Sequence, residues 1–148
     1  MSLEELYREV ILDHYRNPRN RTRLDAPDAT AEGVNPLCGD EILVELSFDG
    51  DTVAAVSITG QGCSISQSSA SMMSEAVKGK TREEIRQLSD RFRAMMDLES
   101  NGEVELDPDH PGSVLGDMEA LQGVRNYPVR IKCANLAWTT LQEALADE

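Results

Sequence analysis

A β-hairpin pattern in the first half of the chain limits the fold to a few architectures. Apolar residues alternate with polar ones from Glu41 to Phe48, and Leu43 is the break in this period of two. The turn sequence Asp49-Gly50-Asp51 follows, and residues 53–59 close the hairpin. A third strand is expected within Ala29 to Val34. The pattern predicts an α+β fold, a small three-stranded antiparallel sheet with about five helices packed mainly on one face.

Helix signals surround the hairpin. Ser2 and Glu5 have the spacing of a capping box, and the helix that they begin is expected to stop near Asn17-Pro18. Thr81 and Glu84 repeat that spacing. Further helices are expected from Ser64 to a stop at Gly79, around Val114 to Leu121, and from Pro128 through Leu145. The acidic, turn-rich residues of about 99–113 are expected to form a surface loop.

Size and charge narrow the class of protein. The 148 residues, 40% of them hydrophobic, suit one domain, 1–148, with a single core. A formal net charge of −13 disfavours nucleic acid and anionic membranes as partners. The first residues are acidic where a secretory signal would be basic, and no apolar run is long enough to span a bilayer. We therefore expect a cytoplasmic protein whose partners are proteins.

Three cysteines carry the chemistry that the sequence suggests. Cys38 lies in a glycine-containing loop, Cys63 at a loop-to-helix junction and Cys133 near the start of the last helix, so all three could converge at one end of the sheet. Asp40 follows Cys38 across Gly39, which can bend the backbone so that both side chains face one ion. An odd number of thiols with a nearby carboxylate fits a four-coordinate metal site better than disulfides.

Each of these features also has a simpler explanation. A single cysteine is often a small buried hydrophobic residue, and Asp40 could cap a turn. His14, on the apolar stripe of the first helix, is expected to pack or to form an interface rather than to bind metal. We assign the serine-rich run from Ser64 to Ser74 to close helix packing, because no histidine stands in a context to activate a hydroxyl. The methionines at core-like spacing are likewise assigned to packing.

Four short sequence motifs, which follow one another along the chain, resemble those of the U-type iron-sulfur cluster assembly proteins (IscU/NifU N-terminal-like), and among these the SufU branch. The similarity spans nearly the whole chain. Its motifs are His14-Tyr15-Arg16-Asn17-Pro18, Asn35-Pro36-Leu37-Cys38-Gly39-Asp40, Gly60-Gln61-Gly62-Cys63-Ser64-Ile65-Ser66 and Arg130-Ile131-Lys132-Cys133-Ala134. The resemblance implies that Cys38, Asp40, Cys63 and Cys133 bind the metal, Zn²⁺ in the SufU branch.

The same resemblance implies a function. SufU-like proteins are zinc-dependent sulfurtransferases that accept persulfide sulfur from a SufS-type cysteine desulfurase and relay it to a SufB-containing scaffold complex. Cys38 would leave the metal and attack the persulfide, with Cys133 as the next candidate for that role. Arg130, one turn before Cys133, would balance the charge of the site or hold the released thiolate.

Two alternatives remain open at this point. An iron-sulfur scaffold would hold iron or a [2Fe-2S] cluster in place of zinc, but IscU-type scaffolds place a histidine immediately before the last cysteine. Here that position is Lys132, whose ammonium group cannot bind a metal. A zinc-stabilised adaptor without chemistry of its own is the second alternative.

Overall fold

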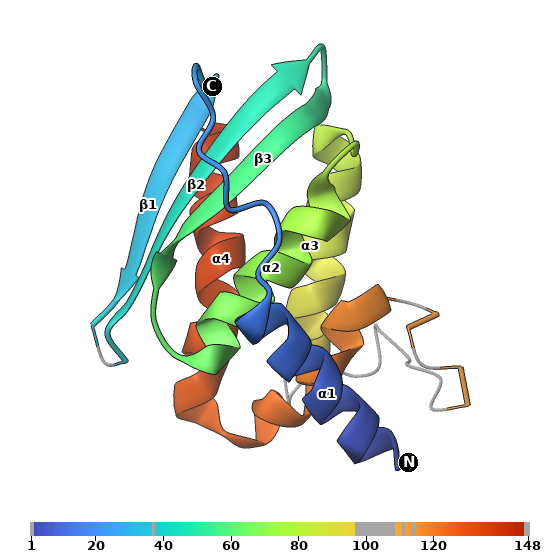
Figure 1. The fold of residues 1–148 in the computed structure, drawn as a ribbon. Coiled ribbons are helices and arrows are strands. Elements are labelled where there is room, and N and C mark those ends of the chain that lie inside the picture. Colours follow the sequence, from blue (N-terminus) through green and yellow to red (C-terminus); the bar gives the residue numbers. More distant parts are fainter. Residues whose placement is uncertain (1, 37, 97–108, 111, 114, 147–148) are drawn as a thin grey trace.

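Three strands and five helical segments make up the part of the chain that the structure, a computed structural model, describes: residues 2–36, 38–96, 109–110, 112–113 and 115–146. The strands β1 (Ala29–Asn35), β2 (Asp40–Asp49) and β3 (Thr52–Gln61) form an antiparallel sheet in that order. The helices are α1 (Leu3–Arg16), α2 (Ser64–Val77), α3 (Arg82–Met96), the 3-10 helix η1 (Gly116–Asn126) and α4 (Pro128–Ala146). Helices α2, α3 and α4 lie on one side of the sheet, which confirms the expected α+β architecture (Figure 1).

The helix starts follow the expected capping chemistry. Ser2 Oγ accepts a hydrogen bond from the Glu5 N–H at 3.1 Å, so α1 begins where the capping box predicts. At α3 the box is reciprocal, because the Glu84 N–H donates to Thr81 Oγ1 at 3.2 Å and the Thr81 N–H donates to Glu84 Oε1 at 3.0 Å.

The helix before α4 differs from the expected one. It is a 3-10 helix that starts at Gly116 and runs to Asn126, beyond the predicted end at Leu121. The buried Glu119 carboxylate accepts hydrogen bonds from the backbone N–H of Leu115 at 2.9 Å and of Gly112 at 3.1 Å. These contacts hold the preceding residues in a turn, so the helix begins later. Most of the predicted acidic loop lies outside the described residues.

The core lies between the sheet and the helices. Apolar side chains of β2 and β3 meet α2, α3 and α4, and Trp138 of α4 stacks on Phe92 of α3 with ring centroids 5.3 Å apart. The methionines assigned to packing are all buried here: Met72, Met73, Met95 and Met96. No helix of the described residues is both long and apolar enough to cross a membrane.

The second face of the sheet is partly covered by the connection between α1 and β1, which crosses it (Figure 1). Arg23 in this connection donates from Nε to Oε1 of Glu45 at 2.6 Å. The Asn20 carbonyl accepts a hydrogen bond from the Ile58 N–H of β3 at 2.8 Å. Glu45 is consequently only 2% exposed although it points away from the main core.

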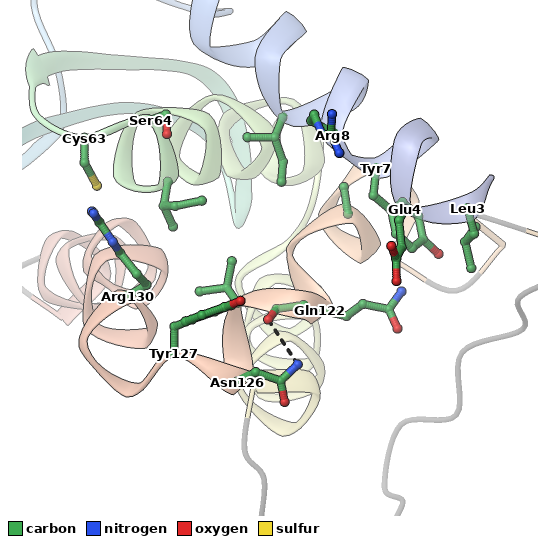
Figure 2. A pocket seen from close by; sticks show the side chains of 15 residues that line it. Leu3, Glu4, Tyr7, Arg8, Cys63, Ser64, Gln122, Asn126, Tyr127 and Arg130 are labelled. Carbon is green, nitrogen blue, oxygen red and sulfur yellow. Dashed lines mark hydrogen bonds between the residues drawn. The ribbon is translucent and has the colours of Figure 1, made fainter. Parts of the chain in front are cut away.

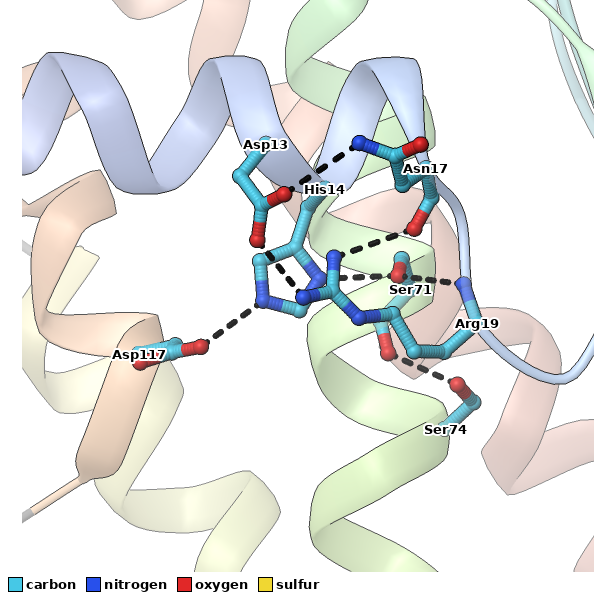
Figure 3. Close-up of polar contacts among 7 residues, drawn as sticks. All are labelled: Asp13, His14, Asn17, Arg19, Ser71, Ser74 and Asp117. Atoms are coloured by element: carbon cyan, nitrogen blue, oxygen red, sulfur yellow. Dashed lines mark hydrogen bonds and ion pairs between the residues drawn. The ribbon is translucent and has the colours of Figure 1, made fainter.

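A polar cluster at His14 fastens α1 to its neighbours (Figure 3). The buried His14 ring places Nδ1 2.8 Å from Ser71 Oγ of α2 and Nε2 2.8 Å from Asp117 Oδ2 of η1. Ser71 Oγ also accepts from the Arg19 N–H at 2.9 Å. A ring that donates from Nε2 and accepts at Nδ1 gives every group in this chain of contacts a partner. His14 thus serves packing between helices.

Candidate metal centre

Cys38 lies in the turn that joins β1 to β2. Asn35 and Asp40 form the last pair of the β1–β2 ladder, and the turn between them is closed by the Cys38 N–H, which donates to the Asn35 carbonyl at 3.2 Å. Gly39 has φ +68°, a left-handed conformation that suits glycine and brings the chain back into β2. The Cys38 side chain is half-buried. The turn therefore presents a sulfur atom at the end of the sheet with access to solvent.

Asp40 begins β2 and is fully buried. Its Oδ1 accepts a hydrogen bond from the Cys63 N–H at 2.8 Å. Burial pushes the pKa of the carboxyl upward, but the hydrogen bonds from the Cys63 backbone and from the Cys133, Ser66 and Cys63 side chains outweigh it, so the pKa lies below its ordinary value. Asp40 is thus held as a carboxylate.

Cys63 is the N-cap residue of α2. Its Sγ accepts a hydrogen bond from the Ser66 N–H at 3.5 Å and lies 3.9 Å from Asp40 Oδ2. Gly62 comes directly before it with φ +155°, and a Cβ there would collide with the Asp40 carboxylate and with Ser66 Oγ. Because glycine has no Cβ, the chain can pass close to Asp40 at Gly62.

Cys133 lies in the second turn of α4 and is fully buried. Its Sγ is 3.1 Å from the Sγ of Cys38, and both cysteines are free thiols. Burial raises the pKa of the Cys133 thiol, and the neighbouring Cys38, Asp40 and Cys63 raise it further. The surroundings of Cys133 thus disfavour its thiolate unless a cation is present.

The structure brings the four predicted ligands to one place. One ligand atom each from Cys38, Asp40 and Cys133 forms a group whose members lie within 4.8 Å of one another, and Cys63 lies beside Asp40. Three sulfur atoms and one carboxylate oxygen fit a tetrahedral Zn²⁺ site, since zinc prefers thiolates and accepts carboxylates. Thiolates also suit iron-sulfur clusters, so the donor set alone admits both.

Two cations of α4, Arg130 and Lys132, were singled out in the sequence. Arg130 is exposed in the first turn, and the negative charge of Cys63, followed by that of Cys133 and Cys38, raises its pKa. Its guanidinium group points toward Cys63 (Figure 2). Lys132 is also exposed. Arg130 is thus in a position to offset the charge of the site.

Sequence reasoning missed two donors to the site. The Asn35 side chain donates from Nδ2 to Cys133 Sγ at 3.6 Å, and Ser66 hydrogen-bonds Asp40 through its side chain. Both residues stand near predicted ligands in the sequence. Asn35 is the first residue of the motif that contains Cys38, and Ser66 is the third residue after Cys63, the N-cap of α2. Their partners lie far away along the chain, and only the fold identifies them.

An open groove of about 980 Å³ leads away from the site. Cys63 and Arg130 lie at one end, and the first turn of α1, with Leu3 and Glu4, lies at the other (Figure 2). Tyr127 and other residues of η1 and its end line the side between them. The sulfur atom at the start of α2 is therefore next to a surface depression.

Comparisons with known proteins agree with this geometry. The family model for the NifU-like N terminal domain matches residues 6–134. The chain is 44% identical over 148 residues to the zinc-dependent sulfurtransferase SufU of Bacillus subtilis (strain 168), with 99% of this chain and 94% of the relative covered. It is 39% identical over 143 residues to the iron-sulfur cluster assembly scaffold protein IscU of Streptococcus pyogenes serotype M1, with 97% and 84% covered.

Solved structures show the same fold. A putative iron-sulfur cluster assembly scaffold protein for the SUF system of Fervidobacterium islandicum AW-1 superimposes with a TM-score of 0.80 at 35% identity, covering 93% of this chain and 94% of the other. The N-terminal part of a NifU-like protein from Brucella abortus gives a TM-score of 0.80 at 26% identity, covering 97% and 94%. The predicted resemblance to the U-type assembly proteins is confirmed.

Proposed function

Because the chain belongs to the family of NifU-like N-terminal domains, we propose that it is a zinc-dependent sulfurtransferase of iron-sulfur cluster biogenesis. The observation that carries the proposal is how differently the members of a shared ligand set are held: Asp40 and Cys133 are fully buried, the half-buried Cys63 caps α2 through its sulfur, and the half-buried Cys38 lies on a turn. A site of this kind can release one sulfur atom while the others stay in place. The similarity to a SufU protein supports zinc as the metal.

The four ligands take separate roles in this proposal. Asp40, Cys63 and Cys133 would hold the metal, and Cys38 would be the residue whose sulfur is free to react. When bound, Zn²⁺ keeps the sulfur atoms as thiolates and protects them from oxidation. Arg130 offsets the negative charge of the cluster and stabilises the Cys38 thiolate once it is free.

The transfer step is a thiol–disulfide type exchange. The Cys38 thiolate attacks the outer sulfur of a persulfide on a SufS-type cysteine desulfurase. A new S–S bond forms on Cys38, the S–S bond of the donor breaks, and the donor cysteine leaves as a thiolate that takes up a proton. The persulfide on Cys38 then passes its sulfur to a SufB-containing scaffold complex. Three free cysteines suit the reducing cytoplasm in which these partners would work.

Cysteine desulfurase turnover tests this function. We expect the zinc-loaded protein to raise the turnover of a cognate SufS-type enzyme several-fold, and the Cys38→Ala variant to lose this stimulation. Mass spectrometry after alkylation should find the persulfide on Cys38. The matched variant Cys133→Ala removes the neighbouring thiol instead. Persulfide that still accumulates on Cys38→Ala would show that another cysteine, Cys133 first, accepts the sulfur.

A scaffold function is the second candidate, because an IscU scaffold protein is 39% identical to the chain. The ligand set would then hold iron or a [2Fe-2S] cluster. Lys132 argues against it, since the residue before Cys133 brings an exposed ammonium group and no fifth ligand. A scaffold should develop cluster absorption with iron and sulfide and pass the cluster intact to an acceptor protein. An adaptor without chemistry of its own should keep its function in Cys38→Ala, provided that the variant folds.

A further inference from the structure

Two of the sulfur atoms in the metal centre lie close together but in different surroundings. Cys38 Sγ and Cys133 Sγ are 3.1 Å apart, so position alone does not decide which of them reacts. Cys38 is half-buried at a turn, and Cys133 is fully buried in a helix. A polar group that contacts both cysteines in different ways would make their chemistry unequal.

Asn35 contacts both cysteines. It is the last residue of β1, lies opposite Asp40 in the ladder and is 7% exposed. Its side-chain Nδ2 donates to Cys133 Sγ at 3.6 Å, while its backbone carbonyl accepts from the Cys38 N–H at 3.2 Å. The side chain therefore engages the sulfur of Cys133, whereas the backbone carbonyl engages the main chain of Cys38.

These contacts affect the two sulfur atoms differently. An N–H group that donates to a sulfur draws electron density from it and fixes the direction of its lone pairs, so that sulfur becomes a weaker nucleophile and a better-oriented ligand. The effect is enhanced by burial, because a hydrogen bond is stronger where water is excluded. The contact to the Cys38 backbone closes the turn and does not involve the Cys38 sulfur.

We propose that Asn35 is a positioning residue that makes Cys133 the fixed sulfur ligand and so directs sulfur acceptance to Cys38. This inference rests on the proposed sulfurtransferase function, and it assigns a cause to the choice between two neighbouring thiols. Asn35 touches neither the donor persulfide nor the transferred sulfur. It acts through Cys133 and through the turn that carries Cys38.

Limiting alkylation of the zinc-loaded protein tests the inference without any sulfur transfer. Iodoacetamide is added below one equivalent, and peptide mass spectrometry gives the ratio of labelled Cys133 to labelled Cys38. In the wild type we expect labelling almost entirely at Cys38. In Asn35→Ala, and in Asn35→Asp, which keeps the size of the side chain but loses the donor, the share of Cys133 should rise about tenfold. The same variants should move persulfide from Cys38 to Cys133 after reaction with the desulfurase.

Pro36→Ala is the matched control, because it alters the same turn and leaves the Asn35 amide in place. It should keep the wild-type labelling ratio. Cobalt substitution gives a second readout, since losing the donor to Cys133 should shift the sulfur-to-cobalt charge-transfer band in the Asn35 variants only. Unchanged ratios and unchanged spectra in both Asn35 variants would overturn the inference. So would failure of both variants to fold by circular dichroism, because Asn35 would then determine the fold and not the choice of thiol.

The two proposals fail separately. If the chain does not accept sulfur at all, the desulfurase assay with the wild type and Cys38→Ala reveals it. The labelling ratio still reports whether Asn35 distinguishes Cys38 from Cys133.

Discussion

Two polar clusters are built on α2, and they differ in whether the protein alone can complete them. At His14 each acceptor faces a donor: Asp117 and Ser71 take both ring nitrogens, and the Arg19 N–H completes Ser71. At the other cluster three thiols and the Asp40 carboxylate face one another, and the Cys133 thiol has a raised pKa because it is buried among them. Burial of polar groups is common to both. Acidic groups that face one another distinguish the candidate metal centre, and a bound cation would stabilise such a group.

Zinc should produce the largest difference between the two clusters. At about 1,000 times its dissociation constant, Zn²⁺ is expected to raise the free energy of unfolding by about 4 kcal/mol, since it binds the folded chain. Thermal unfolding with and without zinc measures the effect. Hydrogen exchange should show the added protection at the β1–β2 turn and at the start of α2 and α4. Equal added protection around His14 would mean that the clusters are not distinct.

His14→Ala should break the other cluster and leave the metal centre intact. The substitution leaves Ser71 without its ring partner and opens a space in the core, so we expect a loss of about 3 kcal/mol in unfolding free energy. Urea unfolding measures it, and zinc affinity by competition with a chelating dye should stay at the wild-type value. The control Asp117→Asn should cost less than about 1 kcal/mol, because that side chain is 60% exposed. A large fall in zinc affinity in His14→Ala would contradict the separation.

Gly62→Ala should act in the opposite direction, damaging the metal centre more than the fold. A Cβ at this position would press against the Asp40 carboxylate, and its φ of +155° is unfavourable for other residues. We expect a loss of about 2 kcal/mol in stability together with a loss of zinc affinity. Gly79→Ala is a matched control, because its φ is +82° but open space surrounds the added Cβ. It should lose stability and keep zinc affinity.

Glu84 gives the smallest expected effect and lies outside both clusters. The hydrogen bonds from the backbone and hydroxyl of Thr81 hold the pKa of its carboxyl below its ordinary value of 4.5. A lowered pKa in the folded state adds stability that is present above pH 4.5 and is lost as the pH falls through the folded pKa. Urea unfolding of the wild type and Glu84→Gln across this range measures it. The difference between them should shrink on acidification, and a difference that stays constant would contradict the linkage.

The features that the sequence predicted well depend on neighbours along the chain. The capping boxes at Ser2 and Thr81 join residues three positions apart, so their hydrogen bonds are formed wherever the helix begins. The four proposed metal ligands could be singled out because they lie in three short motifs, one of which holds both Cys38 and Asp40.

The features that it missed depend on contacts between distant segments. Period-two alternation does not explain why Glu45 is buried, because the connection that covers this second face brings Arg23 to it from outside the sheet. The start of η1 depends on Glu119, which reaches back to the backbone of Leu115 and Gly112. Asn35 donates to Cys133 in the last helix, and the sequence around Asn35 does not predict this contact.

The cap of α2 carries one last consequence. Cys63 Sγ accepts a hydrogen bond from a free N–H in the first turn of the helix, that of Ser66, and it is also a proposed metal ligand. Swinging this sulfur away would uncap the helix at a cost of about 1 kcal/mol, a penalty that the turn carrying Cys38 does not incur. At the proposed site, the Cys38 sulfur on the hairpin would therefore be easier to release from a metal than the Cys63 sulfur, which also caps a helix.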